Sequence, residues 1–148
     1  MIWNKVPSFD AGEAPRRSPS SLSTVVKFAI PTASCHCGAV RIHVRRLPRT
    51  LTVCNCSICR RYGTLWAYFR PTSVRIEAPR GCLVRYSWNK RVRFYYRCAN
   101  CGCVTHYSHR KNRLLNTCGI NANNFDPAVV SSCRIRYFDG AGTWKYLD

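Results

Sequence analysis

Acidic side chains and long hydrophobic runs are scarce in this sequence of 148 residues. Six Asp and Glu residues stand against 24 Lys and Arg residues, which gives a formal net charge of +18. The longest apolar stretch near the N-terminus, "VVKFAI" at residues 25–30, is short and contains Lys27. A membrane-spanning helix needs about 20 apolar residues, and a secretion signal needs an apolar stretch of about 7 to 15. We therefore expect no membrane segment and no secretion signal, and we predict a cytoplasmic protein.

The excess of basic residues consists mostly of arginine, whose planar guanidinium pairs with carboxylate or phosphate through two hydrogen bonds. Residues 41–97 contain fourteen Arg and Lys residues interleaved with aromatic residues, and their single acidic residue is Glu77. This pattern is typical of proteins that bind nucleic acid or another polyanion. A solvated surface and a compositional bias of the genome explain it equally well.

The chain divides into a tail and a domain. Residues 1–24 contain three prolines and five serines without an apolar period, which predicts a disordered or loosely attached tail. From residue 25 to residue 148 the length suits one domain. Apolar and polar residues alternate in "AVRIHVRR" (39–46), "SVRIEA" (73–78) and "CRIRYF" (133–138), as in half-buried strands.

Two further segments, "CLVRYSW" (82–88) and "RVRFYYRC" (91–98), alternate on either side of Asn89 and Lys90, and this arrangement predicts a hairpin. Only "CSICRRYG" (56–63) has the features of a helical turn, which Gly63 would end. The pattern as a whole predicts a mainly β domain with little helix, whose loops carry clusters of cysteine.

Eleven cysteines are many for this length, and in a secreted protein they would indicate a disulfide scaffold. Here the count is odd, the cysteines cluster at gaps of one and two residues, and no secretion signal is expected. We interpret them as thiols kept reduced for metal binding. Seven thiolates and two zinc ions would lower the net charge to about +15, which is still strongly basic.

Four of the thiols form two close pairs, Cys35 with Cys37 in "CHCG" and Cys98 with Cys101 in "CANCG". A structural zinc ion takes four ligands in a tetrahedron, and two short knuckles from distant parts of the chain supply them without strain. The glycine after each pair allows the tight turn that a knuckle needs. The spacing predicts a structural metal site.

The triplet Cys54, Cys56 and Cys59 in "CNCSICRRYG" has no fourth cysteine nearby. Three protein ligands with an open position are the arrangement of a catalytic zinc. Spacing alone leaves two alternatives open. In the first, the "CANCGC" stretch provides a second triplet, Cys98, Cys101 and Cys103, and either triplet could share a site with Cys35 and Cys37. In the second, a more distant cysteine, Cys82 or Cys118, completes a site of four thiolates with Cys54, Cys56 and Cys59.

A resemblance to a known family removes these alternatives. "CHCGAVRIHV", "CNCSICRRYGTLWAYF", "RCANCG", "FDP" and "RYFDGAGTWKYLD" follow one another as the motifs of the glutathione-dependent formaldehyde-activating enzyme family do, from about Ser34 onward. That family also includes centromere protein V. The resemblance implies a β-tent of several small antiparallel sheets, and a carbon–sulfur lyase that forms S-hydroxymethylglutathione from glutathione and formaldehyde.

The resemblance also implies two zinc ions per chain. The first is a structural zinc at Cys35, Cys37, Cys98 and Cys101, and the second is a catalytic zinc at Cys54, Cys56 and Cys59. The sequence departs from the family at Cys103, where relatives have a small or hydroxylated residue. The cysteines outside every family motif, which we interpret as small apolar core residues, are Cys82, Cys118 and Cys133.

Three groups of side chains near the triplet are further candidates. Arg60 and Arg61 follow it directly and could bind a carboxylate of glutathione, although a solvated surface position fits them equally well. The aromatic run of Trp66, Tyr68 and Phe69 favours core packing over a substrate wall. No position among the four histidines indicates a catalytic role; they are His36, His43, His106 and His109.

Overall fold

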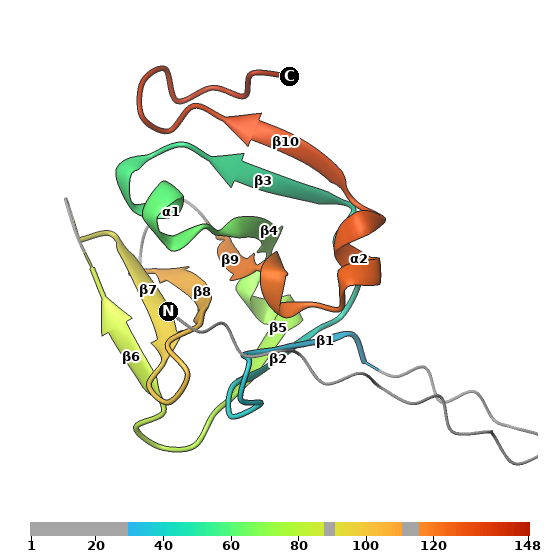
Figure 1. The fold of residues 1–148 in the computed structure, drawn as a ribbon, viewed down its shortest axis with the longest axis vertical. Coiled ribbons are helices and arrows are strands. Elements are labelled where there is room, and N and C mark those ends of the chain that lie inside the picture. Colours follow the sequence, from blue (N-terminus) through green and yellow to red (C-terminus); the bar gives the residue numbers. More distant parts are fainter. Residues whose placement is uncertain (1–29, 88–90, 111–115) are drawn as a thin grey trace, which may run out of the picture.

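The structure is a computed structural model that describes residues 30–87, 91–110 and 116–148. The predicted tail at residues 1–24 lies outside the described residues, as do Asn89 and Lys90 of the predicted hairpin turn. The described part is mostly β, as the sequence predicts, and its strands form two sheets (Figure 1). No helix within it is long and apolar enough to cross a membrane.

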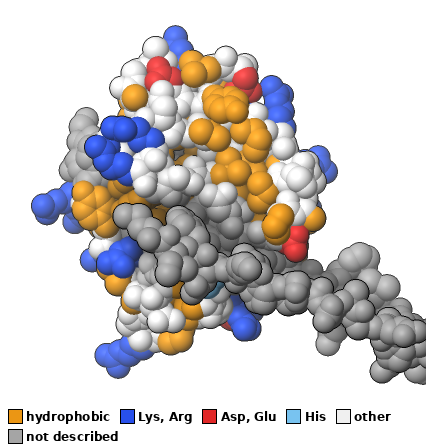
Figure 2. Space-filling view, in the orientation of Figure 1, with side chains coloured by type: hydrophobic (Ala, Val, Ile, Leu, Met, Phe, Trp, Pro, Cys, Tyr) orange, Lys and Arg blue, Asp and Glu red, His pale blue; other side chains and the backbone are white. Residues whose placement is uncertain are grey.

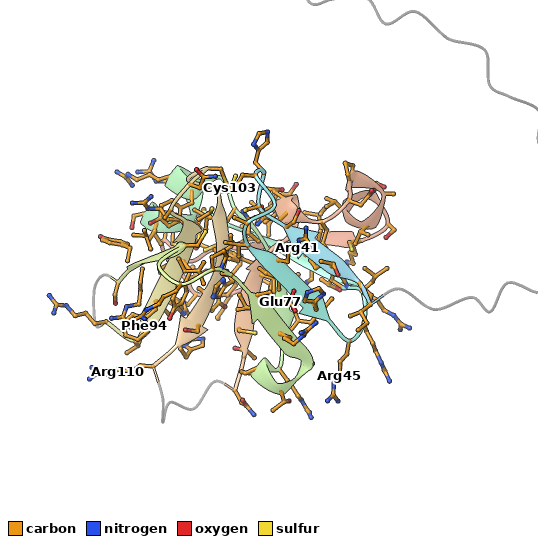
Figure 3. The ribbon with its side chains drawn as sticks, turned by 90° about the horizontal axis from the view of Figure 1, so that it is seen from below. Arg41, Arg45, Glu77, Phe94, Cys103 and Arg110 are labelled. Carbon is orange, nitrogen blue, oxygen red and sulfur yellow. The ribbon has the colours of Figure 1, made fainter. Side chains whose placement is uncertain are left out.

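The smaller sheet has three antiparallel strands in the order β1-β2-β5: β1 (Thr32–Ser34), β2 (Arg41–Val44) and β5 (Val74–Glu77). The predicted alternation in β2 is confirmed, because Ile42 and Val44 are buried and Arg41 is exposed. Arg41 of β2 lies beside Glu77 of β5 in the register of the two strands (Figure 3). Glu77 also accepts a hydrogen bond from His43 at 2.9 Å, so His43 is a structural residue of this sheet.

The larger sheet has seven strands in the order β10-β3-β4-β9-β8-β7-β6. They are β10 (Arg134–Phe138), β3 (Thr50–Cys54), β4 (Leu65–Phe69), β9 (Cys118–Asn121), β8 (Val104–His109), β7 (Arg93–Cys98) and β6 (Leu83–Tyr86). The predicted hairpin is confirmed as the antiparallel pair β6–β7. The pair β10–β3 is parallel, which differs from an entirely antiparallel expectation. Figure 1 shows this pair at one end of the sheet and β6 at the other.

Helical segments are short. Helix α1 (Ser57–Tyr62) ends at Gly63, which adopts the left-handed conformation with φ 58°, as the sequence predicts. Helix α2 (Pro127–Ser131) shows that the prediction of a single helical turn was wrong. Asp126 caps α2 by accepting a hydrogen bond from the Ala128 amide at 2.8 Å, and Pro127 suits its first turn. Two 3₁₀ turns complete the fold, η1 (Pro71–Ser73) and η2 (Ala122–Asn124).

The main hydrophobic core lies between the two sheets, and its fully buried members include Ala33, Val40, Ile42, Leu51, Ala67 and Ile120. A second, aromatic cluster packs around helix α1, where Ile58 and Cys59 meet Trp66, Tyr95 and Tyr107. The first cluster holds the two sheets together, and the second surrounds the cysteine triplet.

Candidate active site

Four cysteines meet at the junction of the two sheets. Cys35 and Cys37 follow β1 of the small sheet, whereas Cys98 ends β7 and Cys101 lies in the turn before β8. Their four Sγ atoms lie within 4.8 Å of one another. The Cys35–Cys37 and Cys37–Cys98 Sγ distances are 3.6 and 3.7 Å. Four thiolates at the zinc–sulfur distance of about 2.3 Å stand about 3.8 Å apart in a tetrahedron, so the group fits zinc.

The turns of these two knuckles have the conformation that the sequence predicts. Gly38 and Gly102 have φ values of 74° and 75°. Their amides donate to the carbonyl oxygens of Cys35 and Cys98 at 2.9 and 3.0 Å. A side chain at either position would be strained in this conformation, because the left-handed region disfavours a Cβ atom.

The three cysteines of the triplet form a second group whose Sγ atoms also lie within 4.8 Å of one another. Cys54 ends β3, Cys56 precedes α1, and Cys59 lies in α1. Trp66 of β4 donates a hydrogen bond from Nε1 to the Cys59 Sγ atom at 3.2 Å, which fixes that thiol and favours its thiolate form. Three convergent sulfur atoms with such a donor also fit zinc, a metal that accepts soft thiolate ligands.

The cysteines that could have closed the triplet lie elsewhere. The Cys82 Sγ atom is 3.8 Å from the Cys98 Sγ atom, beside the four-cysteine group. Cys118 is buried in the main core and donates to the Phe69 carbonyl oxygen at 3.6 Å. Cys133 donates to the Pro48 carbonyl oxygen at 3.1 Å. All eleven cysteines lie in the described residues, and none forms a disulfide.

The triplet forms part of the wall of a cavity of about 390 Å³. Seven aromatic side chains make up most of the remaining wall, together with one arginine and one histidine. The lining residues are Cys54, Cys56, Cys59, Trp66, Tyr68, Arg93, Tyr95, Tyr107, His109, Thr117, Phe138, Gly140, Trp144 and Tyr146. The arrangement combines a thiolate group with an apolar chamber large enough for a small organic molecule.

The chain after β10 is fixed directly to the triplet. Asn55, which lies between two of the cysteines, donates to Asp139 at 2.7 Å and accepts from the Ala141 amide at 2.8 Å. Asp139 in turn accepts hydrogen bonds from the amides of Gly142 and Thr143. These hydrogen bonds hold the pKa of Asp139 well below its ordinary value, with Asn55 as the largest cause. The turn that carries Trp144 to the cavity is therefore anchored on the cysteine loop.

Gly140 leaves no room for a side chain beside the triplet. A Cβ atom there would lie 2.7 Å from the Cys54 Sγ atom and 3.2 Å from the Cys56 Cβ atom. We expect Gly140→Ala to displace Cys54 and to weaken metal binding at the triplet about tenfold or more, as a disturbed ligand environment does. Competition with a chromophoric chelator measures this loss. The four-cysteine site is the internal control, and unchanged affinity at both sites would contradict the prediction.

The arginine beside the cavity differs from the arginines that sequence proximity suggests. Arg60 and Arg61 lie on the exposed side of α1, and neither lines the cavity; Arg61 donates to the Ser57 carbonyl oxygen at 2.8 Å. Arg93 of β7, 34 positions after Cys59 in the sequence, lines the cavity instead. The alternating pattern of "RVRFYYRC" was the only sign of Arg93 in the sequence. That pattern does not distinguish an arginine on a solvated face from one in a cavity wall.

The aromatic run after the triplet has two roles. Phe69 packs against the main core, as predicted. Trp66 is buried yet also lines the cavity, and Tyr68 lines it while remaining 42% exposed. The interpretation of the whole run as core was therefore incomplete, because successive residues of β4 face opposite sides of the sheet.

The two histidines of β8 also occupy different environments. His109 lines the cavity, and burial, together with the charge of Arg93, lowers its pKa. His106 is buried outside the cavity, where it stacks on Tyr96 at 4.4 Å between ring centroids and bonds Thr105 at 3.0 Å. Burial lowers the pKa of His106 to about 4.

We expect His106 to make the domain sensitive to mild acid. The unfolded chain takes up a proton below the ordinary pKa of about 6.5, whereas the folded chain resists it until about pH 4. Neutral His106 therefore contributes fully to the free energy of unfolding above pH 6.5. This contribution is lost as the pH falls toward 4, by at most about 1.4 kcal/mol per pH unit. Urea unfolding measures the free energy of unfolding at pH 7.5 and at pH 5.0. The decrease between these two values should be smaller in His106→Gln than in the wild type. Equal drops would contradict the assignment, since effects of the cysteine sites are common to both proteins.

Comparison with known proteins gives a family match and a similar solved structure. A family model described as glutathione-dependent formaldehyde-activating enzyme matches residues 30–137, a range that includes both cysteine groups. A crystal structure of a protein from Rhodobacter sphaeroides is similar to this chain, with 29% sequence identity and a TM-score of 0.58. That match covers 70% of this chain and 98% of the other.

Proposed function

This chain belongs to the glutathione-dependent formaldehyde-activating enzyme family, and on that premise we propose that it is a zinc-dependent carbon–sulfur lyase or synthase acting on a glutathione-type thiol adduct. One observation carries the proposal. The three-cysteine group forms part of the wall of a cavity of about 390 Å³, whereas the other group brings four possible ligands together. Zinc held by Cys54, Cys56 and Cys59 would favour the thiolate form of a substrate thiol, which is the nucleophile.

The proposed reaction joins glutathione to formaldehyde without any oxidant or reductant. The sulfur atom forms a bond to the aldehyde carbon, the π electron pair of the carbonyl group moves to oxygen, and that oxygen gains the proton that the thiol gives up. The product is S-hydroxymethylglutathione. The reverse reaction breaks the same carbon–sulfur bond and returns the thiol and the aldehyde.

The side chains around the cavity support this chemistry in two ways. Trp66 holds Cys59 through its hydrogen bond to sulfur, so the triplet keeps its orientation. Seven aromatic side chains also give the cavity a largely apolar wall. Tyr95 and Tyr107 are buried there, and burial raises the pKa of Tyr95 to about 12. These phenols stay neutral and can donate hydrogen bonds at neutral pH.

Metal content and turnover together test the proposal. We expect elemental analysis of the purified protein to give two zinc ions per chain, and one zinc per chain would overturn the two-site arrangement. Exchange NMR of glutathione with formaldehyde should show faster formation of S-hydroxymethylglutathione with the protein than in buffer alone. Because this reaction also proceeds without a catalyst, the fully metallated protein must exceed the buffer rate, and equal rates would reject the activity.

Binding of nucleic acid or another polyanion stays a prediction. Figure 2 shows Lys and Arg side chains scattered mainly near the outline of the viewed face, with hydrophobic side chains gathered between them. A polyanion-binding function would appear as an affinity that falls steeply with salt.

A further inference from the structure

Arg93 is a half-buried cation for which the described residues provide no carboxylate partner. Each of the four acidic residues in the described part is engaged elsewhere. Glu77 pairs with His43 and Arg75, Asp139 holds its own turn, Asp126 caps α2, and Asp148 pairs with Arg134 and Arg136. A partly buried guanidinium without an anion is costly, because burial removes its hydration.

One nitrogen atom of Arg93 and one of its neighbour His109 are left unsatisfied. The two residues lie opposite each other in the register of β7 and β8. Within the described part of the chain, Arg93 Nε and His109 Nε2 are buried and have no hydrogen-bond partner. Both residues also line the cavity, so a ligand there would lie beside two side chains that lack a full set of partners.

Aromatic rings surround this pair and leave it in a medium of low polarity. The Arg93 guanidinium carbon lies 5.6 Å from the centroid of the Tyr107 ring and 6.0 Å from that of Trp144. Among the described residues that line the cavity there is no Asp or Glu. A carboxylate would meet the Arg93 guanidinium and the His109 imidazole here, whereas an ammonium group would meet a cation and no Asp or Glu.

The pair lies beside the aromatic cluster that surrounds the triplet. Tyr95, which packs with Cys59 in the aromatic cluster, is two residues from Arg93 on the same face of β7. Two residues of a strand span about 7 Å. A ligand whose sulfur lies at the triplet could therefore reach Arg93 with a group a few bonds farther along its chain.

We propose that Arg93 and His109 form a carboxylate subsite that receives the glycyl carboxylate of a glutathione-type thiol whose sulfur lies at the cysteine triplet. The glycyl end is assigned because it carries a carboxylate alone, whereas the γ-glutamyl end carries an ammonium group beside its carboxylate. This inference rests on the proposed function for the position of the sulfur, and it adds the residues that select the thiol.

The test compares glutathione with its C-terminal amide, which replaces only the glycyl carboxylate by a neutral group of similar shape. Calorimetric titration of the metallated protein requires no turnover. We expect the wild type to bind glutathione at least about tenfold more tightly than the amide, as for hydrogen bonds to a charged group. In Arg93→Met the preference should fall below about twofold. The matched control Arg97→Met removes an exposed arginine of the same strand and should keep the wild-type preference.

Each outcome supports or overturns the subsite separately from the activity. Equal binding of both thiols to the wild type, or a full preference in Arg93→Met, would overturn the subsite even if turnover is observed. A preference that depends on Arg93 without any turnover would leave the subsite standing and reject the lyase. If Arg93→Met does not fold, Arg93→Lys takes its place; this variant keeps the charge but loses the planar fork, and it should reduce the preference without removing it.

Discussion

The Cys98→Ser variant is expected to lose more than about 4 kcal/mol of unfolding free energy, the size of effect that accompanies loss of a structural metal site. Cys98 is fully buried, and its sulfur lies among the thiols that join the loop after β1 to the turn between β7 and β8. These two loops belong to different sheets. Metal held there would connect the sheets, so losing one ligand should separate them as well as open the knuckle.

Denaturant unfolding and elemental analysis of the same samples measure this effect. Cys133→Ser is the matched control, because Cys133 is a partly buried cysteine outside both groups, and serine can keep its hydrogen bond to the Pro48 carbonyl oxygen. The control should retain two zinc ions and nearly all of its stability. A Cys98→Ser protein with wild-type stability would show that the four-cysteine group does not support the fold.

The second large effect is expected at the triplet, where Cys56→Ser should lower the rate of S-hydroxymethylglutathione formation above background by about a thousandfold, an effect of several kcal/mol on the barrier. Cys56 is half-buried at the start of α1, away from the main core. Its replacement should remove one metal ion and leave the fold in place, in contrast to Cys98→Ser.

Circular dichroism, metal content and exchange NMR distinguish these two variants. We expect Cys56→Ser to retain the spectrum of the wild type with one zinc ion per chain. Full activity with a single zinc ion would show that the triplet is not the reaction site. Loss of both metal ions would instead show that the two cysteine groups do not form independently.

Local features of the sequence were sufficient to predict half of the strands and the turns of the two knuckles. In β2, Ile42 and Val44 are buried on one side of a short strand. A period of two residues in the sequence indicates such one-sided burial directly. The knuckles at Gly38 and Gly102 are equally local, since each closes within a few residues. The division of the seven cysteines into two groups came from the family resemblance, because spacing alone also allowed the triplet that ends at Cys103.

The cavity could not be predicted, because its walls come from strands that are distant in the sequence. Arg93 alternates with apolar neighbours as a solvated residue of a half-buried strand would. Its place among aromatic residues of the cavity wall depends on strands and a C-terminal turn that are distant in the sequence. Arg60 and Arg61 adjoin the triplet in sequence, yet α1 directs them outward. Nearness along a helix says little about direction, since neighbouring residues lie about 100° apart around its axis.

The parallel pairing of β10 with β3 also has a consequence for synthesis on the ribosome. In the register of these strands, Thr50 lies opposite Arg134, 84 positions later in the chain. Translation proceeds at about 5 to 20 residues per second, so β10 is synthesised roughly 4 to 17 seconds after β3. During this time one edge of β3 has no partner strand. The thiols of Cys54, Cys56 and Cys59 leave the exit tunnel long before Phe138, Trp144 and Tyr146, which later cover the cavity. We therefore expect metal to reach the nascent triplet directly from solvent, before the last aromatic wall is translated.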